Sequence, residues 1–218
     1  SMTRTPKRRW FQFSLMALLV VMTLACVPLS WLAYERYEVG KRAAAIAAIR
    51  KLGARLEIDS TQPQRPNWLR AILNDQSTGE VVEVLFYRGN VTDADLAHVA
   101  GMTKIKRLDI HGPKVTDAGM GRLAALRNLE TLDLHGSQVT NSGLAELTGL
   151  RKLKRLYLYD TPMTDDGLTH LAGLSNLEHL DLSRTQTTDY GLAHLANLAE
   201  LRSLYLYNNR VTDAGISR

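Results

Sequence analysis

The sequence predicts an α/β fold built as a solenoid, with parallel strands on one face and short helices on the other. A 24-residue segment occurs five times between Val91 and Arg210 with no insertion or deletion. The apolar residues of every copy fall in the same seven columns. Two of these columns alternate as in a short strand, and the earlier ones are spaced by three, as in a helical turn. Such a fixed period indicates stacked units that bury their apolar sides against one another.

The repeats start at regular points, and a partial copy follows them. They begin at Val91, Val115, Val139, Met163 and Thr187, and the partial copy begins at Val211. The seven apolar columns are illustrated by Val91, Leu96, Val99, Met102, Ile105, Leu108 and Ile110. One period upstream, Val84 and Phe86 fall in the two strand columns. We therefore expect residues 59–90 to hold an N-terminal cap and a degenerate first repeat.

The pattern LxxLxLxx, followed by a Thr-Asp turn and GLxxLxxL, resembles the leucine-rich repeat in its 24-residue bacterial form. The resemblance covers about 130 of the 218 residues. It implies a leucine-rich-repeat domain over residues 91–218, with a parallel β-sheet on the concave face and short helices on the convex face. Together with the N-terminal segments described below, the chain resembles bacterial envelope proteins that carry such repeats behind an N-terminal membrane anchor.

Each repeat opens with polar residues suited to the start of a helix. A Thr followed by Asp or Asn supplies side-chain oxygens that accept hydrogen bonds from the first helical N–H groups. These threonines are Thr92, Thr116, Thr140, Thr164, Thr188 and Thr212. Three residues after each of them stands a glycine that keeps the turn free of a side chain, except in the first copy, which has Asp95.

The N-terminus predicts a membrane anchor. Residues 1–9 carry four basic residues and no acid, and residues 10–34 carry no charge. That segment is long and apolar enough to span a bilayer, with aromatic residues at both ends. We expect a basic cytoplasmic tail, a single-pass transmembrane signal anchor at residues 10–34 and an extracytoplasmic repeat domain. A signal peptide cleaved after Ala25 and a lipid-modified Cys26 are the alternatives.

The segment between the anchor and the repeats predicts a second helix. Residues 35–58 are expected to form a juxtamembrane helix and stalk, with Gly53 ending the helix. After the turn-rich residues 59–67, a short helix around Trp68 is expected to cover the open end of the first strand. The apolar seam of the juxtamembrane helix also offers a possible homodimer contact.

Composition and motifs argue against several classes of function. The net charge of +5 arises in the N-terminal part, because residues 91–218 hold 14 basic and 15 acidic residues. A near-neutral repeat domain does not predict nucleic-acid binding, which needs a clustered basic face. The sequence has no nucleophile, phosphate-loop or zinc-protease motif, and its one cysteine lies in the apolar segment. We therefore predict neither enzyme activity nor a cofactor.

The outward-facing columns of the strands predict a protein-binding face. Tyr157, Tyr159, Tyr205 and Tyr207 form a phenolic patch interrupted by Asp181, and tyrosine offers large contact area at small entropic cost. We predict that this concave face binds an unidentified protein partner at the bacterial cell envelope. Carbohydrate or cell-wall binding by the same tyrosines is the alternative. Arg107 and Arg155 belong to the same face.

A second patch on the face contains Asp109, His111, Asp133 and His135. Two carboxylates side by side across a ladder repel, so we expect Arg107 or protonated histidines to compensate them. A more specific interpretation is that the two His and two Asp bind a divalent metal ion. Repeat duplication produces the same pairs without a ligand, so no metal site is predicted.

The last full repeat has no predicted cap. Leu201, Leu204, Leu206 and Ile216 are expected to be poorly covered. A truncated chain, a frayed end or a second chain would each account for this, and end-to-end packing is a further possible homodimer contact.

Overall fold

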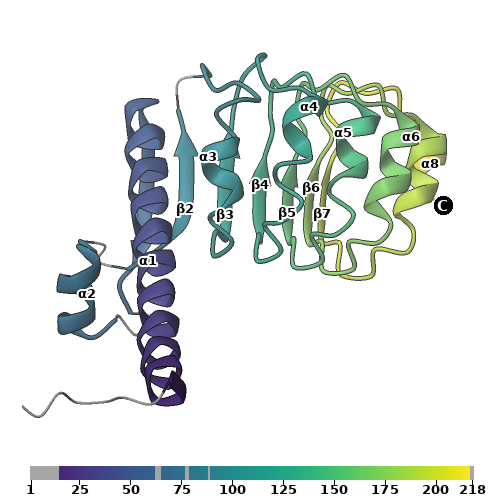
Figure 1. The fold of residues 1–218 in the computed structure, drawn as a ribbon. Coiled ribbons are helices and arrows are strands. Elements are labelled where there is room, and N and C mark those ends of the chain that lie inside the picture. The colour runs from purple at the N-terminus through teal and green to yellow at the C-terminus, as the bar shows by residue number, and fades with distance from the viewer. Residues whose placement is uncertain (1–14, 62–64, 77–78, 88, 217–218) are drawn as a thin grey trace, which may run out of the picture.

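The computed structural model describes residues 15–61, 65–76, 79–87 and 89–216, and it contains one seven-stranded sheet (Figure 1). The strands lie in chain order, and β1 is antiparallel to β2 while all later pairs are parallel. They are β1 (Ala54–Asp59), β2 (Glu80–Phe86), β3 (Arg107–Ile110), β4 (Thr131–Asp133), β5 (Arg155–Tyr157), β6 (His179–Asp181) and β7 (Ser203–Tyr205). The predicted parallel-strand solenoid is confirmed, including the degenerate first strand at Val84 and Phe86.

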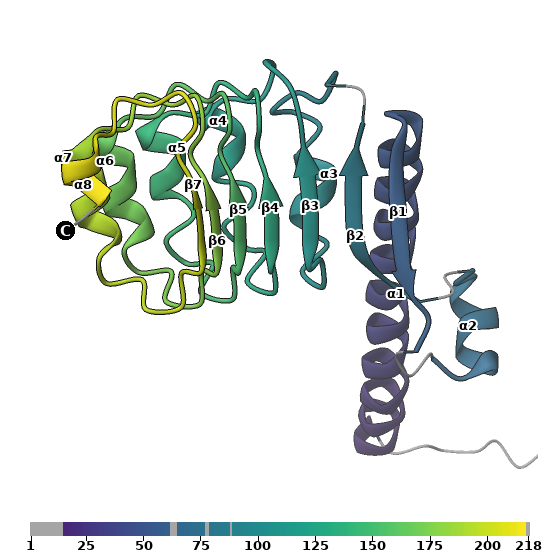
Figure 2. The ribbon, with the colours of Figure 1, turned by 180° about the vertical axis from the view of Figure 1, so that it is seen from behind.

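Short helices cover one side of this sheet, and the strands form the opposite side (Figures 1 and 2). The helices are α3 (Ala97–Ala100), α4 (Asp117–Met120), α5 (Asn141–Ala145), α6 (Asp165–Leu168), α7 (Asp189–Leu192) and α8 (Asp213–Ile216), with 3-10 turns η1 (Thr169–Leu171) and η2 (Ala193–Leu195). Because each repeat advances by one strand, Leu108, Leu132, Leu156, Leu180 and Leu204 pair in register.

The core lies between the sheet and the helices. In the first four repeats every one of the seven apolar columns is at most 8% exposed. The cover is lost at the end of the described solenoid, where Leu204 is 37% and Ile216 is 67% exposed, as predicted. The homodimer predicted from this open end, or from the juxtamembrane seam, stays a prediction.

A side-chain ladder joins consecutive repeats at the start of their helices. Asp93 accepts hydrogen bonds from the backbone N–H and the hydroxyl of Thr116 in the next repeat, at 2.8 and 2.7 Å. The same pair of bonds recurs between Asp117 and Thr140, Asp165 and Thr188, and Asp189 and Thr212. We call this set the Asp–Thr ladder. It gives each threonine hydroxyl a carboxylate to donate to.

Three of the six threonines are shown to cap their own helices, as predicted, whereas α3 of the first repeat has Leu96 and not Thr92 at its N-cap. Thr116, Thr140 and Thr188 accept from the N–H two residues ahead, each at 3.3 Å. In one repeat the ladder residue is Asn141, whose amide donates to the hydroxyl of Thr164 instead of accepting from it. Thr164 makes no such cap.

The glycines of the repeat leave room for this ladder. A Cβ added to Gly143 would lie 2.4 Å from the Oδ1 atom of Asp117, which is far inside van der Waals contact. Gly119 stands in the same relation to Asp93, at 2.5 Å. The ladder residue of the preceding repeat, a carboxylate or in one case the Asn141 amide, is therefore the first atom group that a side chain in the glycine column would meet.

The first repeat has Asp95 in place of the glycine of the later repeats, and the structure gives a physical reason for this difference. The first repeat has no preceding repeat to supply a ladder carboxylate. The Asp95 side chain takes that place and accepts from the N–H and the hydroxyl of Thr92, at 2.9 and 2.7 Å. An aspartate fits here because no carboxylate from upstream occupies the space.

The N-terminal part of the structure is dominated by α1 (Leu15–Lys51), a continuous 37-residue helix. It merges the helical part of the predicted membrane segment with the predicted juxtamembrane helix, and it ends before Gly53 as expected. Among the residues that the structure describes, no helix is long and apolar enough to cross a membrane. The basic tail at residues 1–9 and the start of the segment at residues 10–34 lie outside those residues.

The cover of the first strand differs from the prediction. The stretch expected as stalk contains β1, which pairs with β2, and Ile49 of α1 is fully buried in the core. The helix expected to cover the strand, α2 (Asn67–Leu73), instead lies beside α1 (Figures 1 and 2). Arg65 holds it there through ion pairs with Glu35 of α1 and Asp75. The strand and α1 therefore protect the edge of β2.

We predict that Asp117→Ala lowers the free energy of unfolding by about 2 to 3 kcal/mol, because it removes two charge-assisted hydrogen bonds. Gly143→Ala is expected to cost about as much, through overpacking. In the double variant the glycine substitution should cost at least about 1 kcal/mol less, because the clashing carboxylate is gone. Urea unfolding followed by circular dichroism measures the cycle. Asp166→Ala, at an exposed position next to the ladder residue Asp165, is the control. Strict additivity of the two single substitutions would contradict the coupling.

We predict that Asp95→Gly destabilises the chain by about 1 to 3 kcal/mol, although it restores the residue found in the other repeats. The substitution leaves Thr92 without its carboxylate acceptor. The same unfolding measurement checks this, with amide hydrogen exchange in α3 as a local readout. Unchanged or increased stability would show that the Asp95 carboxylate has no such role.

Candidate functional site

The side of the sheet opposite the helices, here called the open face, carries all the residues predicted to bind. Leucine columns point into the core, and the alternating columns point outward. The strand register places Asp109 beside Asp133, Asp133 beside Tyr157, Tyr157 beside Asp181 and Asp181 beside Tyr205. Repeat geometry thus brings side chains 24 residues apart to neighbouring strands about 4.8 Å apart.

Arg107, two residues earlier on β3, compensates the negative charge of Asp109, as expected. The guanidinium Nε lies 3.1 Å from Oδ1 of Asp109, and Nη2 lies 2.8 Å from Oδ2. Asp109 is only 6% exposed, and this two-point ion pair satisfies its buried carboxylate. The positive charge of Arg107 offsets the repulsion that Asp109 would exert on Asp133.

Asp133 is compensated differently, by two histidines. Its Oδ2 lies 3.2 Å from Nε2 of His111, and its Oδ1 lies 3.3 Å from Nδ1 of His135. The backbone N–H of His135 also donates to Oδ1, at 3.0 Å. The two imidazole rings lie 3.9 Å apart between centroids and are tilted by 36°.

These contacts move the pKa values of the cluster in opposite directions. Burial opposes ionisation of Asp133, but the hydrogen bonds from His111 and from the His135 backbone outweigh it and lower the carboxyl pKa. The hydrogen bond to Asp133 raises the pKa of His111 above its usual value, against the effect of burial. Asp133 is therefore an ionised carboxylate at neutral pH.

The histidines connect to the tyrosine patch through a row of rings. His135 meets Tyr159 edge to face, with centroids 6.3 Å apart. The guanidinium of Arg184 lies 5.6 Å from the centre of the Tyr159 ring and donates to its hydroxyl at 3.2 Å. His111, His135, Tyr159 and Arg184 thus form one continuous row, and the two predicted patches are parts of one surface.

Sequence reasoning missed Arg184. It stands in the turn column after the strands, where the equivalent residues include Gly112, Gly136, Asp160 and Asn208. All five have positive φ, and that of Arg184 is 58°. Left-handed backbone favours glycine or asparagine, and strain at such a residue often accompanies function. The sequence signal that could have indicated Arg184 is that an arginine stands where the equivalent residues are glycine, aspartate or asparagine.

The tyrosines differ in exposure. Tyr157 and Tyr159 are half-buried, whereas Tyr205 and Tyr207 are 55% and 75% exposed. Asp181 and the buried Ser183 separate the two pairs, as predicted, and the backbone N–H of Tyr207 donates to the Ser183 hydroxyl. The Nε of Arg155 donates a hydrogen bond to the hydroxyl of Thr131, at 3.0 Å.

Comparison with protein families agrees with the repeats. Residues 120–202 match the family model described as Zer-1-like, Leucine-rich repeats. The leucine-rich-repeat resemblance is therefore confirmed over this part of the chain. Comparison with curated proteins gave no match.

Two solved structures from Listeria monocytogenes are similar to this chain. Internalin C2 is 24% identical with a TM-score of 0.48, over 64% of this chain and 71% of that one. Internalin F is 22% identical with a TM-score of 0.45, over 66% of this chain and 49% of that one. The comparisons do not support the predicted N-terminal membrane anchor, which stays a proposal.

Proposed function

We propose that the chain is a protein-binding module whose partner docks on the open face of the sheet. The observation that carries this proposal is the exposure of Tyr205 and Tyr207, at 55% and 75%, beside the Tyr159–Arg184 contact. Leucine-rich-repeat domains typically bind protein partners, which is consistent with it. Exposed tyrosine and arginine side chains are the residue types that contribute most to protein interfaces.

The open face favours docking over catalysis. Apart from the buried Asp109, the carboxylate and imidazoles of its cluster are partly exposed on the outer side of the sheet, whereas enzymes stabilise charge in sites that exclude water. Arg107 is neutralised by Asp109, and Arg184 lies 3.4 Å from Asp160, so these two arginines are already paired within the chain. A partner would gain its contact area chiefly from the rings, with Asp181 as a polar contact between the tyrosine pairs.

We predict that replacing Tyr157, Tyr159, Tyr205 and Tyr207 by Ala abolishes capture of the partner from native envelope extracts, whereas Tyr190→Ala does not. Tyr190 lies on the helical side and is 81% exposed, so it controls for loss of an exposed tyrosine. Truncating a tyrosine that is a hot spot of an interface costs about 2 kcal/mol or more. Quantitative mass spectrometry of the captured proteins, with circular dichroism to verify folding, measures the effect. Equal capture by the quadruple variant would remove the open face as the docking site.

Carbohydrate or cell-wall binding remains the second candidate, because the same exposed tyrosines offer flat rings for sugars to stack on. A glycan array probed with the chain separates the two functions. Glycan binding that the four tyrosine substitutions abolish would favour the carbohydrate function over a protein partner.

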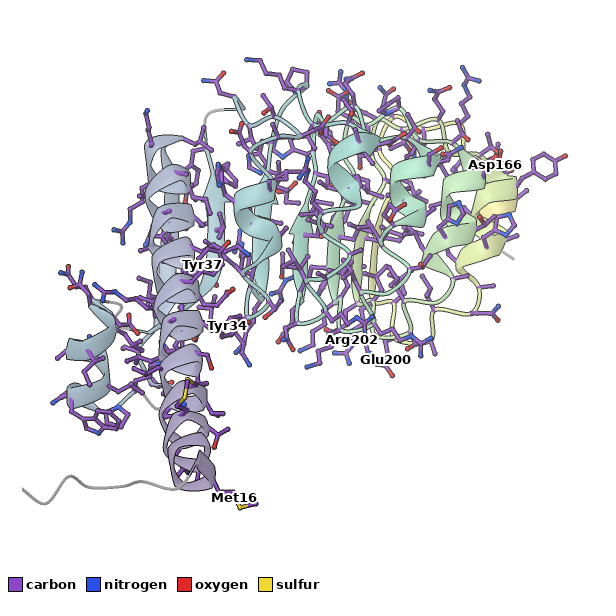
Figure 3. All side chains as sticks on the ribbon, in the orientation of Figure 1. Met16, Tyr34, Tyr37, Asp166, Glu200 and Arg202 are labelled. Atoms are coloured by element: carbon purple, nitrogen blue, oxygen red, sulfur yellow. The ribbon has the colours of Figure 1, made fainter. Side chains whose placement is uncertain are left out.

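We also propose that residues 10–34 anchor the chain in a membrane, with the repeats outside the cytoplasm of a bacterial cell. The charge-free sequence of this segment supports the proposal. So does the high exposure of apolar side chains on the first half of α1, among them Met16 at 78% and Leu24 at 70%. Figure 3 shows Met16 at the end of α1 farthest from the repeats.

This placement predicts that the chain stays with membranes under alkaline carbonate extraction and that external protease digests the repeats in spheroplasts. Replacing Leu24 and Val27 by Arg should release it, since each charge at the centre of a span costs about 2.5 to 3.5 kcal/mol. Immunoblotting of the fractions measures both. Protection of the repeats in intact spheroplasts, with digestion only after lysis, would reverse the proposed orientation.

A further inference from the structure

The cluster of His111, Asp133 and His135 has the composition and spacing of a metal site. One ligand atom from each residue can be chosen so that all three lie within 4.8 Å of one another. The carboxylate is closer still to each ring nitrogen, at 3.2 Å from His111 and 3.3 Å from His135. Ligand bonds of about 2.1 Å at tetrahedral angles put neighbouring ligand atoms about 3.4 Å apart. Small side-chain rotations therefore bring the three groups to metal-binding distances.

The carboxylate is held in place before any ion arrives. The backbone N–H of His135 donates to Oδ1 of Asp133 at 3.0 Å, which fixes the orientation of the carboxylate. Hydrogen bonds of this kind orient metal ligands in known sites. Asp133 is also partly buried, with 20% of its side chain exposed, which limits competition by water.

The charges around the cluster permit a cation. Arg107 is a positive charge that acts on His111, and its guanidinium is bound at two points by Asp109. The cluster itself consists of one carboxylate and two imidazoles whose ring centroids are 3.9 Å apart.

The neighbouring repeats show what is special about this pair. Asp181 on β6 is built like Asp133, because the N–H two residues ahead, of Ser183, donates to its Oδ1 at 2.9 Å. The residue at that position is serine there and not histidine. Among the described residues no imidazole forms an ion pair with Asp181, although His179 lies two residues earlier on β6. Asp181 is therefore an internal control, with the same backbone setting and no imidazole partner.

We propose that His111, Asp133 and His135 bind a divalent transition-metal ion of the zinc class on the open face, and that a further coordination position is left for water or for a partner's side chain. Two imidazoles and one carboxylate suit Zn²⁺, whereas Mg²⁺ and Ca²⁺ prefer oxygen ligands. Three protein ligands are the usual number where a zinc ion keeps an exchangeable position. This site goes beyond the proposed protein binding and does not depend on it.

Isothermal titration calorimetry with zinc chloride tests the site, using the full chain in mild detergent and without an affinity tag. We expect one Zn²⁺ per chain, and Co²⁺ in its place should give the visible absorption of a tetrahedral site. Asp133→Asn and His135→Gln should each weaken zinc affinity by at least about 100-fold, beyond the 10- to 100-fold typical of residues that only hydrogen-bond to a ligand. A millimolar excess of Mg²⁺ should leave binding unchanged.

Matched variants separate this site from adventitious binding. Asp181→Asn, at the equivalent position two strands away, should not change zinc affinity, and neither should the double change His170→Gln and His194→Gln on the helical side. Absence of zinc binding would overturn the proposal. So would retained affinity in Asp133→Asn, or loss of affinity on changing the helical-side histidines. Thermal unfolding of Asp133→Asn verifies that the fold is kept, and unchanged zinc affinity in Tyr205→Ala and Tyr207→Ala separates this result from the docking proposal.

Discussion

The Asp–Thr ladder is the interaction on which the register of the solenoid depends. The leucine columns exclude a slip by one residue, which would turn the core side chains outward, but not a slip by two residues, which keeps them inward. A carboxylate that accepts from both the N–H and the hydroxyl of one threonine in the next repeat fits a single offset. The glycine column follows from the ladder, since a Cβ at Gly143 would meet the carboxylate of Asp117. Polar ladder, glycine and helix cap are thus one device, repeated along the helical side of the sheet.

This register decides what the open face can contain. Once Leu108 pairs with Leu132 and Leu156, every outward column becomes a row of side chains on adjacent strands. Identical residues in adjacent repeats then contact their own kind, which is unfavourable for carboxylates and favourable for rings. Asp109 and Asp133 are neighbours, and each requires its own compensation, one from Arg107 and the other from histidines. The two imidazoles and the ring of Tyr159 instead form a favourable row.

The repeats were predictable because their pattern is periodic, and the other parts were not because their positions depend on unique contacts. The apolar columns predicted strands β2 to β7 and the loss of cover at Leu204. They gave no indication of β1, since residues 54–59 lie outside the period and owe their strand to antiparallel pairing with β2. The place of α2 depends on the ion pairs of Arg65 with Glu35 and Asp75, which no local pattern reveals. On the open face, the sequence predicted the proximity of the histidines to Asp133 but not their hydrogen bonds or the contribution of Arg184.

Departures from the repeat pattern identify the residues with individual roles. Asp95 departs from the glycine column because the first repeat has no upstream carboxylate, and its side chain takes over that bond. Arg184 departs from the glycine, aspartate and asparagine of the turn column, and its guanidinium reaches the ring of Tyr159. Ser183 stands where the three preceding repeats have a ring, at His111, His135 and Tyr159, and Asp181 forms no ion pair with an imidazole among the described residues. In a periodic chain the backbone environment is nearly constant from copy to copy. A residue that breaks its column therefore owes its identity to a contact that the other copies do not make.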